Sequence, residues 1–165
     1  MNCRRGSQMS TIVLEINGVV SEVEADPATP LIYMLRNRLG LVGAKLGCGL
    51  EQCGACAVIV DGEKVLSCVR AVSEFEGRAI TTVEGLAAGG ELSPVQRAFL
   101  ETGAAQCGYC TSGLIVALTA YLQAAESPDR QGAVEALEGH LCRCGAHADV
   151  LRAVERLVSE AADGG

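Results

Sequence analysis

The stretch 47–68 constrains this chain more than any other part of the sequence, because it sets four cysteines at a fixed spacing. Within GCGLEQCGACAVIVDGEKVLSC, four residues separate Cys48 from Cys53, two separate Cys53 from Cys56, and eleven more precede Cys68. Three thiols in so short a segment require the loop to turn sharply back on itself. Glycines stand beside these cysteines, and glycine accepts the positive φ angles of such a turn. The stretch therefore predicts a compact loop wrapped around one bound group.

The spacing C-x4-C-x2-C…C is typical of a plant-type [2Fe–2S] site, in which four thiolates hold two irons. Backbone N–H groups of such a loop can point at the sulfurs and help to set the reduction potential. Zinc is the alternative, but structural zinc sites usually combine paired C-x2-C units. The sequence therefore favours a [2Fe–2S] cluster bound by Cys48, Cys53, Cys56 and Cys68.

The composition indicates a folded, acidic protein of one or two small domains. Apolar residues make up 49% of the 165 residues and aromatic residues only 3%, so aliphatic side chains must form the core. The formal net charge of −7 argues against nucleic-acid binding. No apolar run approaches the ~18 residues of a membrane span. We therefore expect a protein that binds no nucleic acid and has no membrane span.

We do not expect the start of the chain to act as a secretion signal. Arg4 and Arg5 lie within Met1–Ser10, but no apolar segment follows them, so we interpret this start as a flexible extension. This indicates a cytoplasmic, reducing location, where thiols are free to bind metal. Nine cysteines are an odd number, which weakens a framework built only of disulfides. Cys3 is left over and is interpreted as a free thiol.

The first half of the sequence predicts a small β-grasp domain made of two hairpins around one helix. Asn17-Gly18 separates two alternating apolar–polar runs, as in a hairpin with a type I′ turn. Thr29 is expected to cap the helix, with Pro30 at its first position. The predicted elements are strands 11–16 and 19–24, a helix over 31–39, a second hairpin from 57–60 and 64–67, and a last strand over 78–83.

Beyond the Gly- and Ala-rich stretch 84–90, the pattern becomes helical. Ser93-Pro94-Val95-Gln96 is a capping box, with proline at the first helical position. The run 112–125 is apolar nearly all round, which is typical of a helix buried in a bundle or against a partner. A short helix over 133–137 and an amphipathic helix over 148–159 follow. The second half is therefore expected to be all helical.

A second set of cysteines lies at the predicted starts of two of these helices. Cys107 and Cys110 precede the apolar helix, and Cys142 and Cys144 precede the last helix. The 31 residues between Cys110 and Cys142 suffice for one helix out and a shorter one back, so the pairs can meet. Helix N-termini carry about half a positive charge, which stabilises a bound anion. Our hypothesis is a second [2Fe–2S] cluster, although zinc also suits this set alone.

Together, the two sets resemble the small iron–sulfur subunit of the molybdenum hydroxylases, the xanthine oxidase family. The resemblance covers about 11–158 and depends on the strings GCGLEQCGAC, QCGYCTSG and LCRCG. It implies an α+β fold: an N-terminal β-grasp, plant-type ferredoxin-like domain over 10–84, then an all-α four-helix-bundle [2Fe–2S]-binding domain over 85–160. A flexible extension over 1–9 and a tail over 161–165 would flank them.

The resemblance implies an electron-transfer subunit of a hetero-oligomeric oxidoreductase, without a catalytic centre of its own. Two [2Fe–2S] clusters would pass electrons one at a time from a molybdopterin cofactor in a large subunit to an FAD-binding medium subunit or a cytochrome. Gln106 and Cys144 are implied to lie against the pterin. The expected substrates of the complex are N-heterocycles or aldehydes. Many members read CRCTGY where this chain reads CRCGAH over 142–147, which leaves the substrate open.

Two other functions fit part of the pattern. A freestanding two-cluster ferredoxin is one, although a second cluster at buried helix starts suits a fixed neighbour better. A zinc-stabilised interaction module is the other. His140 and His147 flank the C-x-C unit, but four cysteines complete this site, so we expect capping or surface roles for both. Tyr109 is expected either to shield a cluster or to pack, and Arg143 to neutralise a cluster, pair at an interface or remain solvated.

Overall fold

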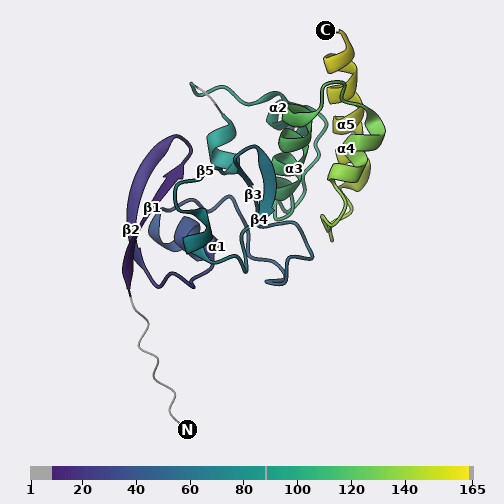
Figure 1. Cartoon of the computed structure of the whole chain (residues 1–165). Coiled ribbons are helices and arrows are strands. Elements are labelled where there is room, and N and C mark those ends of the chain that lie inside the picture. The colour runs from purple at the N-terminus through teal and green to yellow at the C-terminus, as the bar shows by residue number, and fades with distance from the viewer. Residues whose placement is uncertain (1–8, 88, 164–165) are drawn as a thin grey trace.

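The computed structural model describes residues 9–87 and 89–163, and it shows a five-stranded sheet followed by a group of helices (Figure 1). The predicted α+β class is therefore confirmed. Most of the predicted extension 1–9, including Cys3, and the last two residues of the predicted tail lie outside the described residues. None of the helices in the described part of the chain combines the length and the hydropathy that crossing a membrane requires.

The sheet has the strand order of a β-grasp domain, β2-β1-β5-β3-β4, with β1 and β5 parallel and all other neighbours antiparallel. The first hairpin is confirmed, because Ile16 pairs with Val19 across a turn in which Asn17 and Gly18 have φ angles of 54° and 75°. Type I′ turns need positive φ at both positions. The strands are β1 Ser10–Ile16, β2 Val19–Ala25, β3 Ala57–Val60, β4 Glu63–Leu66 and β5 Ala79–Thr81.

The helix that crosses the sheet differs from the prediction at its start. It consists of α1 (Leu31–Tyr33) and a π-helical turn, η1 (Met34–Arg38). Thr29 is not the cap: Pro30 holds that position in an extended conformation, with no side-chain cap bond. The reason is tertiary, because Pro30 forms a β-bridge with Ala71 and is thereby kept out of the helix. The predicted cap at Thr29 was therefore wrong.

The sheet and this helix enclose the first hydrophobic core. Leu14 from β1, Leu31 and Leu35 from the helix, Val58 from β3 and Phe75 are fully buried in it. Phe75 ends the 3₁₀ turn η2 (Val72–Phe75), which follows the second hairpin. The last strand is shorter than predicted, because the chain turns into the 3₁₀ segment η3 (Val83–Leu86) soon after β5.

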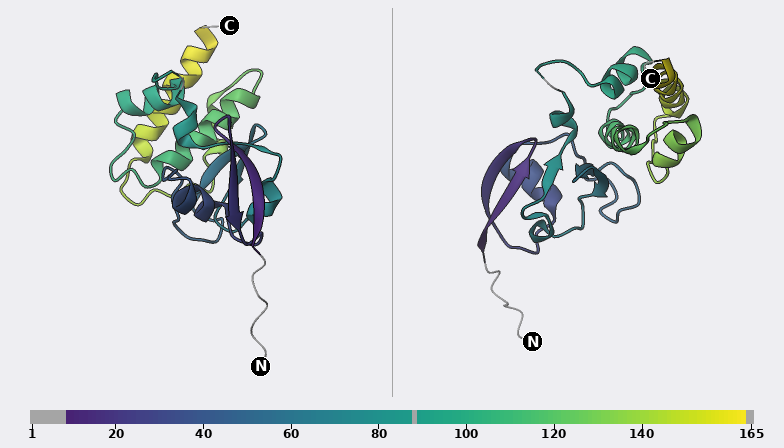
Figure 2. Two further views of the ribbon diagram at one scale, coloured as in Figure 1. Left: turned by 90° about the vertical axis from the view of Figure 1, so that its left-hand side faces the viewer. Right: turned by 45° about the horizontal axis from the view of Figure 1, so that its top comes forward.

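The described part of the second half contains four helices, and Figure 2 shows this helical part beside the sheet. Ser93 and Gln96 make the predicted capping box: the Ser93 hydroxyl accepts from the Gln96 N–H at 3.3 Å, and the Gln96 side chain accepts from the Ser93 N–H at 2.9 Å. The short helix begins three residues earlier than predicted, because Asp129 caps it by accepting from the Gly132 N–H. The helices are α2 Pro94–Glu101, α3 Thr111–Ala124, α4 Arg130–Ala136 and α5 His147–Asp163.

Helix α3 is apolar nearly all round because it packs against protein on two sides. Leu114 and Leu118 face the core of the helical half, whereas Val116 and Ala120 pack against Ile59 and other residues of the sheet. A helix covered by protein on both sides needs no polar face. The helix predicted over 112–125 thus spans Thr111–Ala124, is buried over residues 112–120 and joins the two cores.

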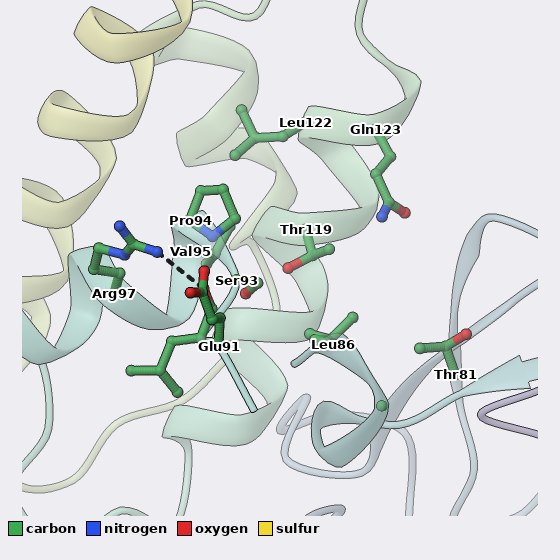
Figure 3. A pocket seen from close by; sticks show the side chains of 12 residues that line it. Thr81, Leu86, Glu91, Ser93, Pro94, Val95, Arg97, Thr119, Leu122 and Gln123 are labelled. Atoms are coloured by element: carbon green, nitrogen blue, oxygen red, sulfur yellow. Dashed lines mark hydrogen bonds between the residues drawn. The ribbon is translucent and has the colours of Figure 1, made fainter. Parts of the chain in front are cut away.

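A pocket of about 780 Å³ lies between the end of the sheet, the segment that follows it and helices α2 and α3 (Figure 3). Thr81 at the end of β5, Thr119 and Gln123 of α3 and Arg97 of α2 line it, and Arg97 donates to the Leu92 carbonyl at 3.4 Å. No cysteine is among its 12 lining residues. The candidate metal centre therefore lies elsewhere.

Candidate metal centre

The first cysteine set lies in and after the loop that joins η1 to β3. The backbone N–H groups of Leu50 and Gln52 donate to the Cys48 sulfur at 3.3 and 3.2 Å, and the Cys48 N–H donates to the Cys53 sulfur at 3.4 Å. The loop closes this tightly because Gly49, between the two cysteines, has a φ of 66°. The predicted N–H···S contacts are thus formed by the protein itself.

These contacts and burial shift the thiol pKa values in opposite directions. The N–H groups of Gln52 and Leu50 lower the pKa of Cys48 to about 7, because they stabilise the thiolate. Burial raises the pKa of Cys56 to about 12. Cys48 is exposed, whereas Cys56 and Cys68 are buried. Since metals bind thiolates, the exposed side of the loop is prepared for a cation, and the buried thiols must lose their protons as a metal binds.

The second set lies at two helix starts, as the spacing predicted. Cys110 is the N-cap of α3, and Cys142 and Cys144 lie in the turn before α5. The N–H of Tyr109 lowers the pKa of Cys107, and that of Ala146 lowers the pKa of Cys142. Burial raises the pKa of Cys110 to about 11. Backbone N–H groups just before the two helices thus stabilise the thiolates of Cys107 and Cys142.

The thiols meet in pairs, which suits a two-iron cluster. Each of the two irons in such a cluster takes two thiolates. Among the residues that the structure describes, no three Cys, His, Asp or Glu side chains converge as a single ion would require. Each set supplies four cysteines, the number of thiolates that a [2Fe–2S] cluster takes, so the donor set fits this chemistry. The thiols that shift each other's pKa are Cys48 with Cys53, Cys56 with Cys68, Cys107 with Cys144, and Cys110 with Cys142.

The two sets face one shared space. A pocket of about 320 Å³ is lined by Cys48 and Cys53 from the first set and by Cys107 and Cys110 from the second. The backbone connects them as well, because the Leu141 N–H donates to the Cys53 carbonyl at 3.1 Å. Two groups bound at these sets would therefore be close neighbours in one protein.

Glycines allow this close approach, and His140 fills the space between the halves. A Cβ at Gly113 of α3 would lie 2.3 Å from the Gly54 carbonyl oxygen, and a Cβ at Gly54 would lie 2.3 Å from the His140 ring. His140 is 5% exposed, and burial, followed by the charge of Lys64, lowers its pKa. The predicted capping or surface role of His140 was therefore wrong. No local signal marks this burial, because the contact joins distant segments.

The remaining predicted site residues lie at the surface. Gln106 and Cys144 are exposed, so a partner could reach both of them. His147 is exposed at the start of α5, and Arg143 lines the pocket between the two sets. Tyr109, 46% exposed, lines the same pocket.

Comparisons with known proteins agree with this geometry. Residues 14–87 match the family model described as "2Fe-2S iron-sulfur cluster binding domain", and residues 82–155 match "[2Fe-2S] binding domain". A nicotinate dehydrogenase subunit of Pseudomonas putida is 48% identical over 147 residues, which cover 89% of this chain and 94% of that protein. The xanthine dehydrogenase iron-sulfur-binding subunit of Escherichia coli is 46% identical over 144 residues, covering 84% and 87%.

Solved structures show the same fold. Quinoline 2-oxidoreductase from Pseudomonas putida 86 superposes with a TM-score of 0.87 at 36% identity, covering 96% of this chain and 99% of that one. Aldehyde oxidoreductase from Desulfovibrio gigas gives 0.84 at 36% identity, covering 93% of this chain and 17% of that longer chain. The fold and the thiols thus define a two-domain protein for two [2Fe–2S] clusters. The chain belongs to the family of small iron–sulfur subunits of the molybdenum hydroxylases.

Proposed function

We propose that the chain carries electrons, one at a time, from a molybdopterin centre in a large partner subunit to a flavoprotein or cytochrome acceptor. The observation that supports this most is the pocket shared by the two cysteine sets. Each set also has exposed members, Cys48 in the first and Cys107 and Cys144 in the second. Electrons can therefore enter at one set, cross the shared space and leave at the other.

The residues that would hold the clusters follow from the thiol pairs. The outer cluster is assigned to Cys48, Cys53, Cys56 and Cys68, and the inner cluster to Cys107, Cys110, Cys142 and Cys144. When bound, the clusters supply one-electron redox chemistry. The chain itself contributes the thiolates, the N–H groups that stabilise them, and the burial of Cys56 and Cys110 that keeps water from one side of each site.

The pterin contact is assigned to Gln106 and Cys144. Both are exposed in the turns beside the inner cysteine set, so a large subunit docked there could contact both. Arg143 lies between two inner ligands and would offset the negative charge of a cluster at such an interface. In this proposal the inner set, rather than the outer set, lies beside the molybdenum subunit.

The substrate of the complex is proposed to be an N-heterocycle or an aldehyde. Relatives named as subunits of a nicotinate dehydrogenase and of an isoquinoline oxidoreductase, at 48% and 41% identity, support the first class. A relative named as an aldehyde oxidoreductase subunit, with 38% identity, supports the second. We place the complex in the cytoplasm, where cysteines remain free to bind iron.

The isolated chain is expected to show iron–sulfur absorption but no substrate turnover. Its sites supply electron carriers, and the substrate chemistry belongs to the partner subunit. Purified alone, it should bleach on reduction with dithionite and leave nicotinate and aldehydes unchanged in a dye-coupled assay. From its native source, it should co-migrate with a large molybdenum-containing chain on size exclusion. Substrate oxidation by the isolated chain, or its elution alone as a ferredoxin, would contradict the proposal.

A further inference from the structure

Tyr109 connects the two cysteine loops through one side chain. It lies between Cys107 and Cys110 in the helical half, and its hydroxyl donates to the Leu46 carbonyl at 2.6 Å. Leu46 stands two residues before Cys48 in the other half. The Tyr109 ring passes close to Gly47, since its Cε1 atom lies 3.8 Å from the position that a Cβ would take there. One side chain thus bridges backbone segments that carry cysteines of both sets.

Among the described residues, this bridge is one of two hydrogen bonds that join the loops around their shared pocket. The other joins the Leu141 N–H to the Cys53 carbonyl at 3.1 Å and involves backbone atoms only. Tyr109, Leu141, Cys53 and Cys107 all line the pocket of about 320 Å³. Of these two bonds, only the one from Tyr109 depends on a side chain.

The position of Tyr109 does not serve a hydrophobic core. The residue is 46% exposed and belongs to none of the buried clusters of the described residues. An exposed hydrogen bond adds little to folding, because water would satisfy both groups in the unfolded chain. The bond does constrain geometry, because a short bond from a rigid ring holds the two loops at a fixed spacing.

We propose that Tyr109 is a positioning residue for electron transfer between the two cluster sites. The proposal rests on the proposed function, because it requires both sites to hold redox groups. In this step one electron leaves the reduced inner site, which is oxidised, and enters the outer site, which is reduced; no bond forms or breaks. Electron tunnelling slows steeply with distance, so a loop spacing fixed by the Tyr109–Leu46 bond keeps the step fast.

The test uses the full chain loaded with both clusters and two matched variants. Tyr109→Phe keeps the ring and removes the hydroxyl. Tyr121→Phe is the control, because the Tyr121 hydroxyl also bonds to backbone but joins α3 to the start of α4 within the helical half. It donates to the Asp129 carbonyl at 3.2 Å and accepts from the Asp129 N–H at 3.0 Å. The readouts are iron content, the EPR signal of each reduced cluster, the magnetic splitting between them, and the rate of electron redistribution after flash reduction, followed by freeze-quench EPR.

We expect Tyr109→Phe to keep its iron and both EPR signals, to show weaker splitting, and to redistribute electrons severalfold more slowly, because tunnelling slows steeply with distance. Tyr121→Phe should match the unaltered chain in splitting and rate. Unchanged splitting and rate in Tyr109→Phe would overturn the proposal. Loss of iron from its inner site would also overturn it, because the tyrosine would then retain the cluster. Absence of both signals in the unaltered chain would instead refute the proposed function.

Discussion

Cys107→Ala is expected to remove the inner cluster and leave the outer one intact. Iron should fall from about four to about two per chain, because each [2Fe–2S] site needs all four thiolates. Cys107 is exposed, so its replacement removes a ligand without creating a cavity in a core. Iron analysis and EPR of the reduced chain measure the result. In the complex, transfer of electrons to the acceptor should fall to background, while the molybdenum centre is still reduced by substrate.

Two further variants make this experiment specific. Cys48→Ala, at an equally exposed ligand of the other set, should remove the outer signal and spare the inner one. Cys3→Ala should change neither, because the eight cysteines assigned to the clusters leave Cys3 without a role. Iron content and both EPR signals that survive Cys107→Ala would show that the inner ligand set is assigned incorrectly.

Gly54→Ala is expected to destabilise the contact between the two halves. The substitution forces alanine to a φ of 71°, which costs about 1–2 kcal/mol, and it drives a Cβ to 2.3 Å from the buried His140 ring, which adds about 1–3 kcal/mol of overpacking. A chain of this size loses roughly 2–4 °C of midpoint per kcal/mol. The apparent midpoint of thermal unfolding of the loaded chain should therefore fall by roughly 5–15 °C.

A matched glycine separates backbone strain from the contact with His140. Gly77 has a nearly identical φ of 73°, but a Cβ there would meet nothing within 4 Å, so Gly77→Ala should cost only the strain of about 1–2 kcal/mol. His140→Ala should remove the obstacle, so that Gly54→Ala then costs no more than Gly77→Ala. Equal losses for Gly54→Ala with and without the histidine would contradict the proposed packing.

Local signals predicted much of the fold. The hairpin turn at Asn17-Gly18 and the capping box from Ser93 to Gln96 depend on residues a few positions apart, and both are confirmed. The start of the first helix could not be predicted in this way, because a bridge to Ala71, far along the chain, holds Pro30 extended. The domain boundaries 10–84 and 85–160 stay predictions.

The candidate site, too, was predictable only in part. Spacing alone predicted two sets of cysteines, and two members of each set line one pocket in the structure. The contacts that hold the sets together were not predictable, because the Gly54–His140 packing and the Tyr109–Leu46 bond join segments whose proximity exists only after both halves have folded. The family resemblance implies that Gln106 and Cys144 contact the pterin, and these two contacts remain a prediction.

The most direct test of the central claim is the iron and acid-labile sulfide content of the full chain, measured together with its EPR spectrum after reduction. The chain should be purified anaerobically from iron-replete cells. Two clusters on eight thiolates predict about four irons and about four sulfides per chain, with two distinct EPR signals. A folded chain that supports the activity of its complex while holding zinc, or no metal at all, would contradict this account.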